Sequence, residues 1–155
     1  MPVSDSLRGP YGNLPLKVQV AALPWRRTDG RIEILLITSR ATGRWVLPKG
    51  WPEKNETYWE AAAREAGEEA GISGSVETEE AGRYLYAKVR ATAGDIACEV
   101  HVFPLKVKNL AGKWKEARQR TRRWMNGAEA AAAVREPDLA ALIEDFCRRA
   151  RAKAA

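Results

Sequence analysis

Alternating apolar and polar positions predict strands over much of the chain. Two strands, residues 17–26 and 31–39, flank Thr28-Asp29-Gly30, and an Asp-Gly pair between such runs is a strong hairpin signal. Further strands are predicted at residues 44–47, 74–79, 82–91, 95–108 and 120–125. Helical periodicity separates these strands and closes the chain, so the pattern favours an α/β fold with a mixed sheet between helices.

The central helix is predicted to begin after Thr57 and to end at Gly71. Thr57 and Glu60 have the spacing of a capping box, and glycine is the usual residue at a helix C-terminus. Residues at helical spacing predict a face that packs closely on the sheet: Trp59, Ala63, Ala66 and Ala70. Two further helices are predicted at residues 127–135 and 137–153.

Three glutamates on the central helix are the first candidates for chemistry. Glu65, Glu68 and Glu69 stand at i, i+3 and i+4, so their carboxylates share one helix face. Like charges at these spacings cost an isolated helix roughly a few tenths of a kcal/mol per pair, and a bridging cation would relieve that cost. Oxygen ligands alone favour Mg²⁺ or Mn²⁺. A solvated acidic face is the alternative interpretation of these residues taken alone.

A longer pattern decides between these two interpretations. Its fixed positions are Gly50, Glu56, Arg64-Glu65, Glu68-Glu69 and Gly71-Ile72. Residues 50–72 are similar to the Nudix box at each of these positions, and Ala66 is the one departure, where the family normally has a larger aliphatic residue. The resemblance implies a Nudix-type α/β/α sandwich with a mixed β-sheet. It also implies an enzyme that hydrolyses phosphoanhydride bonds with Mg²⁺ or Mn²⁺.

The resemblance assigns roles to residues of the box. Glu65, Glu68 and Glu69 would hold the metal directly or through water, and the carbonyl of Gly50 would add a ligand. Arg64 would pair with Glu56 to orient the helix and the loop before it. The resulting catalytic and metal-binding set comprises Gly50, Glu56, Arg64, Glu65, Glu68 and Glu69.

The general base is less sharply defined, because the family varies it between a box glutamate and a glutamate from a later loop. Glu65 is the first choice in this chain. Glu99 and Glu116 are the later candidates, although each taken alone could be an ordinary surface residue.

Two segments outside the box resemble the diphosphoinositol-polyphosphate and diadenosine-polyphosphate branch of the family. They are SRATGRWVLPKG at residues 39–50 and the later KWKEARQRTRRWM. The similarity implies phosphate-contacting cations at Lys17, Arg26, Arg40, Arg120 and Arg122. Lys49 and Trp51, on either side of Gly50, complete the expected substrate-binding set. Lys49 is also a departure, because it replaces a glycine-rich stretch, and no histidine lies near the C-terminus.

Charge is distributed unevenly along the chain and supports a phosphate-rich ligand. Residues 51–80 contain nine glutamates, whereas residues 106–155 contain thirteen Lys and Arg against six acidic residues, within a net charge of +6. An acidic metal site beside a basic wall suits a small-molecule polyphosphate. The basic charge also leaves RNA binding open without favouring it.

Length and composition predict one domain over residues 1–155, with an N-terminal extension at residues 1–16. No apolar run suggests a membrane span, and the two cysteines match no zinc or redox spacing, so a cytoplasmic protein is expected. Two functional alternatives remain open. One is a housekeeping hydrolase of nucleoside triphosphates or nucleotide sugars, and the other is a non-catalytic module that binds RNA or a nucleotide. Whether the protein is a monomer or a homodimer is also undetermined.

Overall fold

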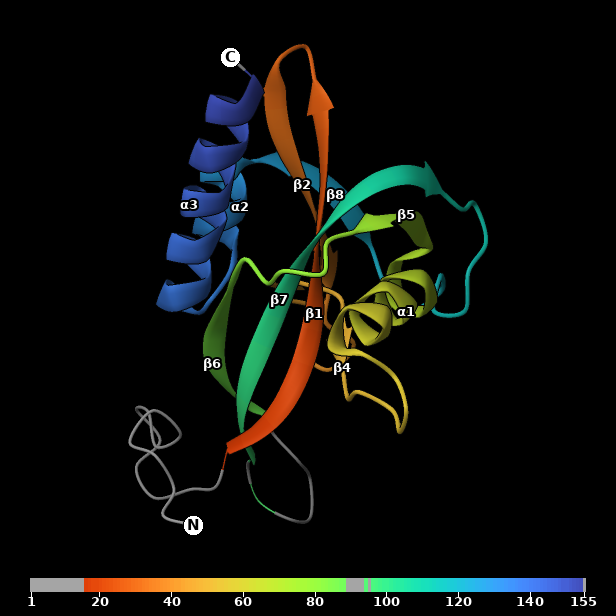
Figure 1. Cartoon of the computed structure of the whole chain (residues 1–155). Helices are drawn as coiled ribbons and strands as arrows, with labels where there is room; N and C mark the ends of the chain where they lie inside the picture. Colours follow the sequence, from red (N-terminus) through yellow and green to blue (C-terminus); the bar gives the residue numbers. More distant parts are fainter. Residues whose placement is uncertain (1–15, 89–93, 95, 155) are drawn as a thin grey trace.

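The computed structural model describes residues 16–88, 94 and 96–154, and these residues form a mixed eight-stranded sheet. Its centre is the parallel pair β1 (Leu16–Thr28) and β7 (Ile96–Leu110), which cross the molecule side by side (Figure 1). The remaining strands pair antiparallel: β2 (Arg31–Thr38), β3 (Trp45–Val46), β4 (Lys49–Gly50), β5 (Ile72–Val76), β6 (Gly82–Lys88) and β8 (Arg122–Asn126). The path through the sheet is β3-β2-β1-β7-β5, with β4, β6 and β8 paired to β1, β7 and β2.

Helices cover both faces of this sheet, as the sequence predicts. Helix α1 (Tyr58–Ala70) lies on one face, and α2 (Gly127–Ala133) and α3 (Pro137–Ala154) lie on the other (Figure 1). Alternate residues of β1 serve the two cores, because successive side chains of a strand point to opposite faces. Val20 packs with the core under α1, whereas Ala21 packs with the core under α2 and α3. None of the described helices combines the length and hydropathy of a membrane span.

The predicted hairpin is confirmed. Thr28 pairs with Arg31, and Asp29 and Gly30 both adopt positive φ, of 51° and 76°. This is the two-residue turn that an Asp-Gly pair favours.

Several element boundaries differ from the predictions. The strand predicted at residues 44–47 is the shorter β3, and β4 follows beyond Pro48, which has no N–H to donate to a ladder. The strand predicted at 74–79 is β5, which begins at Ile72 because Gly71 turns the chain directly out of α1. Helix α2 ends at Ala133 rather than 135, and β8 begins at Arg122 rather than 120. The predicted residues 89–91 and most of the extension lie outside the described residues.

Both predicted ends of α1 are confirmed. Thr57 and Glu60 form a complete capping box, and Gly71 ends the helix at φ 68°. The buried face is shifted from the prediction, since Ala61, Ala62, Ala66 and Ala70 are buried while Trp59 and Ala63 are only partly buried. The alanine at position 66 is therefore enclosed between the helix and the sheet, and helix packing there leaves no exposed surface.

Candidate active site

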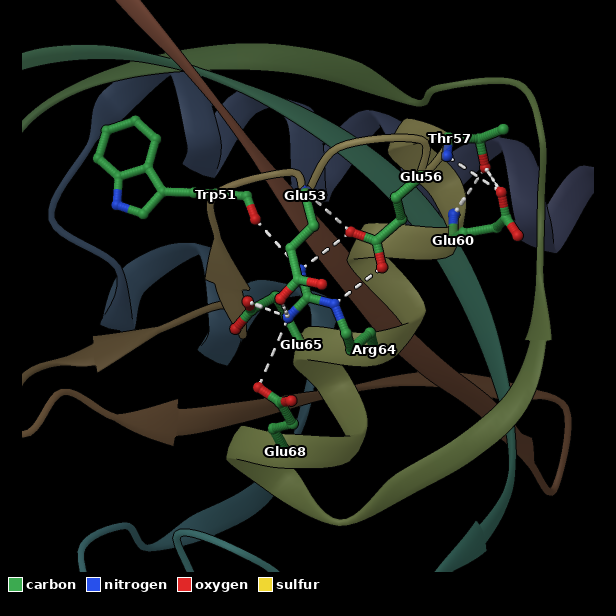
Figure 2. Close-up of polar contacts among 8 residues, drawn as sticks. All are labelled: Trp51, Glu53, Glu56, Thr57, Glu60, Arg64, Glu65 and Glu68. Atoms are coloured by element: carbon green, nitrogen blue, oxygen red, sulfur yellow. Dashed lines mark hydrogen bonds and ion pairs between the residues drawn. The ribbon is translucent and has the colours of Figure 1, made fainter.

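One side of the candidate site is organised around the guanidinium of Arg64. Figure 2 shows several carboxylates converging on it from α1 and from the loop that precedes α1. Arg64 donates to both oxygens of Glu56, at 2.8 and 3.0 Å, and to the carbonyl of Trp51 at 3.1 Å. Its Nη1 donates to Glu65 at 2.8 Å and lies 3.5 Å from Glu68. The hydrogen bond from Arg64 lowers the pKa of Glu56, so this carboxylate stays charged and fixes the loop to the helix.

Glu65 lies directly against the backbone of Gly50. A Cβ at position 50 would stand 2.4 Å from the carboxyl carbon of Glu65, so only glycine allows this approach. Burial raises the pKa of Glu65, although Arg64 opposes the shift. The predicted neighbours Gly50 and Glu65 are thus brought together, with a carboxylate held in a partly dry environment.

Glu69 is the more deeply buried carboxylate of α1. It accepts a hydrogen bond from the backbone N–H of Lys49 at 3.1 Å and lies 3.3 Å from Nη2 of Arg120. Burial raises its pKa to about 7, and the charge of Arg120 opposes that shift. The Lys49 ammonium lies 4.7 Å from the ring centre of Tyr86, and burial lowers its pKa to about 8.

Arg120 is nearly enclosed, with 7% of its side chain exposed. It donates to Glu116 through Nε at 2.9 Å and to the carbonyl of Thr38 at 3.1 Å. Its contact with Glu69 joins a segment far along the chain to the box helix. Spacing in the sequence gave no signal for this pairing, because 51 residues separate the two partners.

These side chains border a cavity of about 460 Å³ with walls of both charges. The acidic lining residues are Glu65, Glu69 and Glu116, and the basic ones are Arg40, Arg44, Lys49, Lys88, Arg120 and Arg135. Trp51 also lines the cavity, is 39% exposed, and stands 5.3 Å from the ammonium of Lys88. Four predicted substrate contacts, Arg40, Lys49, Trp51 and Arg120, therefore meet at one place. Three further cations of the lining were not predicted, because an isolated basic residue is no signal for a site: Arg44, Lys88 and Arg135.

Other predicted residues lie elsewhere. Arg26 pairs with Glu33 at 2.8 Å and stacks over Trp124, and Arg122 donates to the carbonyls of Ala70 and Ala111. Lys17 is exposed on β1, two residues before Gln19, which does line the cavity.

The two later candidates for the base are also separated. Glu99 pairs with His101 and Arg83, away from the cavity lining, whereas Glu116 lies in the lining. Of these two glutamates, only Glu116 stands beside the carboxylates of the box.

The donor atoms fit a hard divalent cation in type and environment. Among the described residues, no three acidic, histidine or cysteine side chains are gathered closely enough to hold a metal. The reason is local, since Arg64 draws Glu65 and Glu68 to one side while Arg120 draws Glu69 to the other. Burial nevertheless raises the pKa values of Glu65 and Glu69, and both lie beside the backbone of Lys49 and Gly50. Carboxylates that are short of positive charge suit an added cation.

Comparison with known proteins gives a consistent result. A family model described as the NUDIX domain matches residues 15–146. "Nudix hydrolase 21, chloroplastic" of Arabidopsis thaliana is 34% identical over 143 residues, which cover 90% of this chain and 70% of that protein. "Nudix hydrolase 13, mitochondrial" of the same plant is 34% identical over 125 residues, which cover 77% of this chain and 62% of that protein. This chain therefore spans only part of the length of either relative.

A solved structure is similar in fold. The crystal structure of C. elegans Ap4A hydrolase superposes with a TM-score of 0.60 over 84% of this chain and 96% of that one, at 21% sequence identity. At this identity the likeness shows a shared fold.

Proposed function

We propose, from the premise that this chain belongs to the Nudix family, that it is a metal-dependent pyrophosphohydrolase that cleaves a phosphoanhydride bond by attack of water. One observation carries the proposal. The buried carboxylates Glu65 and Glu69 face a cavity whose remaining charged lining is almost entirely basic. The carboxylates would bind a catalytic cation, and the basic lining would bind a polyanionic substrate.

The metal site would be formed by Glu65, Glu68 and Glu69 with the carbonyl of Gly50. Mg²⁺ or Mn²⁺ suits these oxygen ligands, and Mg²⁺ characteristically shares its coordination with substrate phosphates and water. When bound, such an ion would lower the pKa of a coordinated water and neutralise charge on the leaving phosphate. Arg64 would keep Glu65 and Glu68 in register with the loop at Glu56.

The basic wall would hold the phosphates that are not being cleaved. Arg40 and Arg44 reach the cavity from the loop between β2 and β3 and Lys88 from the end of β6, so they could contact several phosphates of one substrate. Lys49 adds an ammonium next to the glutamates themselves. Glu65 remains the proposed general base, with Glu116 as the alternative because it lies in the same cavity.

A diadenosine polyphosphate or a diphosphoinositol polyphosphate is the proposed substrate. The number of cations around the cavity favours a ligand with more phosphates than a nucleotide sugar carries. The partly exposed indole of Trp51 at the cavity could stack on an adenine, which an inositol substrate lacks. The proposal therefore leaves these two substrates to be separated by experiment.

The deciding experiment measures release of phosphate and pyrophosphate with Mg²⁺, with Mn²⁺ and with chelator. The panel contains diadenosine polyphosphates, diphosphoinositol polyphosphates, nucleoside triphosphates, nucleotide sugars and 5′-triphosphate RNA. We expect metal-dependent turnover concentrated on the first or second class. Turnover concentrated on triphosphates or nucleotide sugars would replace the substrate proposal with the housekeeping alternative. Metal binding without turnover on any substrate would favour the binding module.

A further inference from the structure

The C-terminal end of α1 is closed by donors from one distant segment. The last carbonyls of a helix have no partner within the helix and must be satisfied from elsewhere. Residues 111–122, hereafter the clamp segment, supply donors to four consecutive carbonyls. The pairs are Glu116 N–H to Glu68 at 3.3 Å, Trp114 Nε1 to Glu69 at 2.9 Å, Arg122 Nη1 to Ala70 at 2.8 Å and Ala111 N–H to Gly71 at 2.8 Å.

Trp114 and Arg122 form the rigid part of this clamp. The guanidinium of Arg122 lies 3.9 Å from the ring centre of Trp114 and also donates to the carbonyl of Ala111 at 2.7 Å. A Cβ at Gly71 would approach the Trp114 ring to 3.0 Å, so the indole packs tightly on the turn that ends α1. The last turn of α1 contains no basic residue of its own, and Arg122 provides the positive charge that favours a helix C-terminus.

The clamp segment also contacts the side chain of Glu69, whose carbonyl it binds. Arg120 lies 3.3 Å from the Glu69 carboxylate, while Trp114 binds the Glu69 carbonyl. Both ends of this residue are therefore fixed from one segment. A rotation of the last helical turn would need to break the Trp114 hydrogen bond and would carry the Glu69 carboxylate with it.

We infer that Trp114 is a positioning residue, which holds the last turn of α1 through its indole N–H so that Glu69 stays at its place in the site. The inference rests on the proposed function, because it takes Glu69 to act on a metal. Residues that orient metal ligands characteristically change metal affinity or activity by about 10- to 100-fold when altered.

The test is Trp114→Phe, which keeps an aromatic ring under Arg122 but removes the N–H donor together with part of the indole. Trp124→Phe is a matched control, because the Trp124 ring also lies under an arginine, Arg26, at 4.0 Å. Among the described residues, its buried Nε1 has no hydrogen-bond partner. Mn²⁺ affinity is measured directly by electron paramagnetic resonance, and kcat and KM are measured at saturating metal.

We expect Trp114→Phe to weaken Mn²⁺ binding by about tenfold, with KM for substrate unchanged at saturating metal, and Trp124→Phe to match the wild type. Hydrogen–deuterium exchange of the Ala111 and Glu116 amides should accelerate only in Trp114→Phe, because both amides donate to the end of α1. Wild-type Mn²⁺ affinity together with wild-type exchange in Trp114→Phe would overturn the inference. Equal losses in both variants would do the same, since they would indicate a general effect of removing an indole.

The test of Trp114 can fail or succeed independently of the proposed hydrolase activity. A wild-type protein that binds Mn²⁺ but hydrolyses nothing would defeat the proposed activity, while the affinity comparison would still decide the role of Trp114. Arg122→Lys provides a second variant. It keeps the positive charge, but a lysine cannot donate to the carbonyls of both Ala70 and Ala111 as the guanidinium does. We expect it to accelerate exchange at the same two amides, whereas the neighbouring Arg123→Lys should not.

Discussion

The two arginines that hold the box glutamates work in opposite surroundings. Arg64 sits at the solvent side of α1, with 23% of its side chain exposed, among four carboxylates from positions 53, 56, 65 and 68. Arg120 is 7% exposed and pairs with two carboxylates, those of Glu69 and Glu116, besides its hydrogen bond to the carbonyl of Thr38. The Arg64 cluster and the Arg120 cluster thus offer the same chemical pair at two depths.

In both clusters the arginine lowers the pKa of its carboxylates and burial opposes that shift, but the two effects balance differently. Arg64 lowers the pKa of Glu56, whereas Glu69 has its pKa raised to about 7 in spite of Arg120, because burial outweighs the attraction. The Arg64 cluster is therefore a charged brace that orients the helix. Glu65 and Glu69 both keep a raised pKa beside their arginines, but only the shift of Glu69 in the Arg120 cluster is large, so an added cation would stabilise Glu69 most.

The largest predicted effect comes from removing the buried charge. Glu69→Gln should leave the fold intact and reduce metal-dependent turnover by at least about a hundredfold, as expected when a catalytic metal is misplaced. Glu53→Gln is the matched control from the Arg64 cluster, since its side chain is 68% exposed. Its turnover should stay close to that of the wild type. Steady-state hydrolysis decides, and near-normal turnover in Glu69→Gln would remove this residue from the proposed mechanism.

Arg120→Ala should have the next largest effect. Removing one partner of a buried pair leaves the other uncompensated and costs about 3–5 kcal/mol. We expect a lower free energy of unfolding and a lower kcat on every substrate. If Arg120 instead contacted a substrate phosphate, as the sequence predicts, Arg120→Ala would raise KM most for long polyphosphates.

Arg40 provides the comparison for that variant, because 59% of its side chain is exposed at the cavity. Arg40→Ala should raise KM and leave the free energy of unfolding nearly unchanged. Urea unfolding and initial rates on two substrates of different phosphate number separate the two patterns. If Arg120→Ala behaved like Arg40→Ala, the contrast between the two clusters would fail.

The contacts of the Arg64 cluster could be predicted from the sequence, and those of the Arg120 cluster could not. Arg64, Glu56 and Glu65 lie within ten residues, where helix geometry and a known motif determine which side chains can meet. The arginine partner of Glu69 comes from a segment far along the chain, which the pairing of strands β2 and β8 brings to Thr38 and the box. The same limit explains Arg122, whose local sequence suggests a phosphate contact although its guanidinium closes a helix end.

Helix and strand types were also largely predictable, because period and caps are local properties. Thr57, Gly71 and the Asp-Gly turn each specify their conformation through their own chemistry. Boundaries such as the end of β5 at Val76 depend on how far the strand pairs with β7, which no local pattern reveals.

Gly50 stands between the clusters and gives a third prediction. Gly50→Ala would force its Cβ into the Glu65 carboxylate, and because this is the end of a flexible side chain the cost should be at most about 1 kcal/mol, the low end for overpacking. Turnover should fall as well, because Glu65 must move. Gly112→Ala is the control, since its Cβ would meet no atom within 4 Å. Thermal melts of both variants test the prediction, and equal stability would show that Glu65 relocates without cost.

The last prediction concerns the pH dependence of stability without metal. The pKa of Glu69 rises on folding from 4.5 to about 7, so the folded state binds more protons than the unfolded state between these values. Stability contributed by the protonated form is therefore present at low pH and is lost as pH rises through 7, with a slope of at most about 1.4 kcal/mol per pH unit. Glu69→Gln removes this slope, so the variant should gain stability relative to the wild type between pH 5 and 7 and run parallel above it.

Glu56→Gln should differ from the wild type in the opposite direction and below pH 4.5, because the folded-state pKa of Glu56 is lowered by Arg64. Urea unfolding with chelator across pH 3–8 measures both differences. Parallel curves for wild type and Glu69→Gln throughout would mean that Arg120 compensates Glu69 fully, and the two clusters would then differ in depth alone.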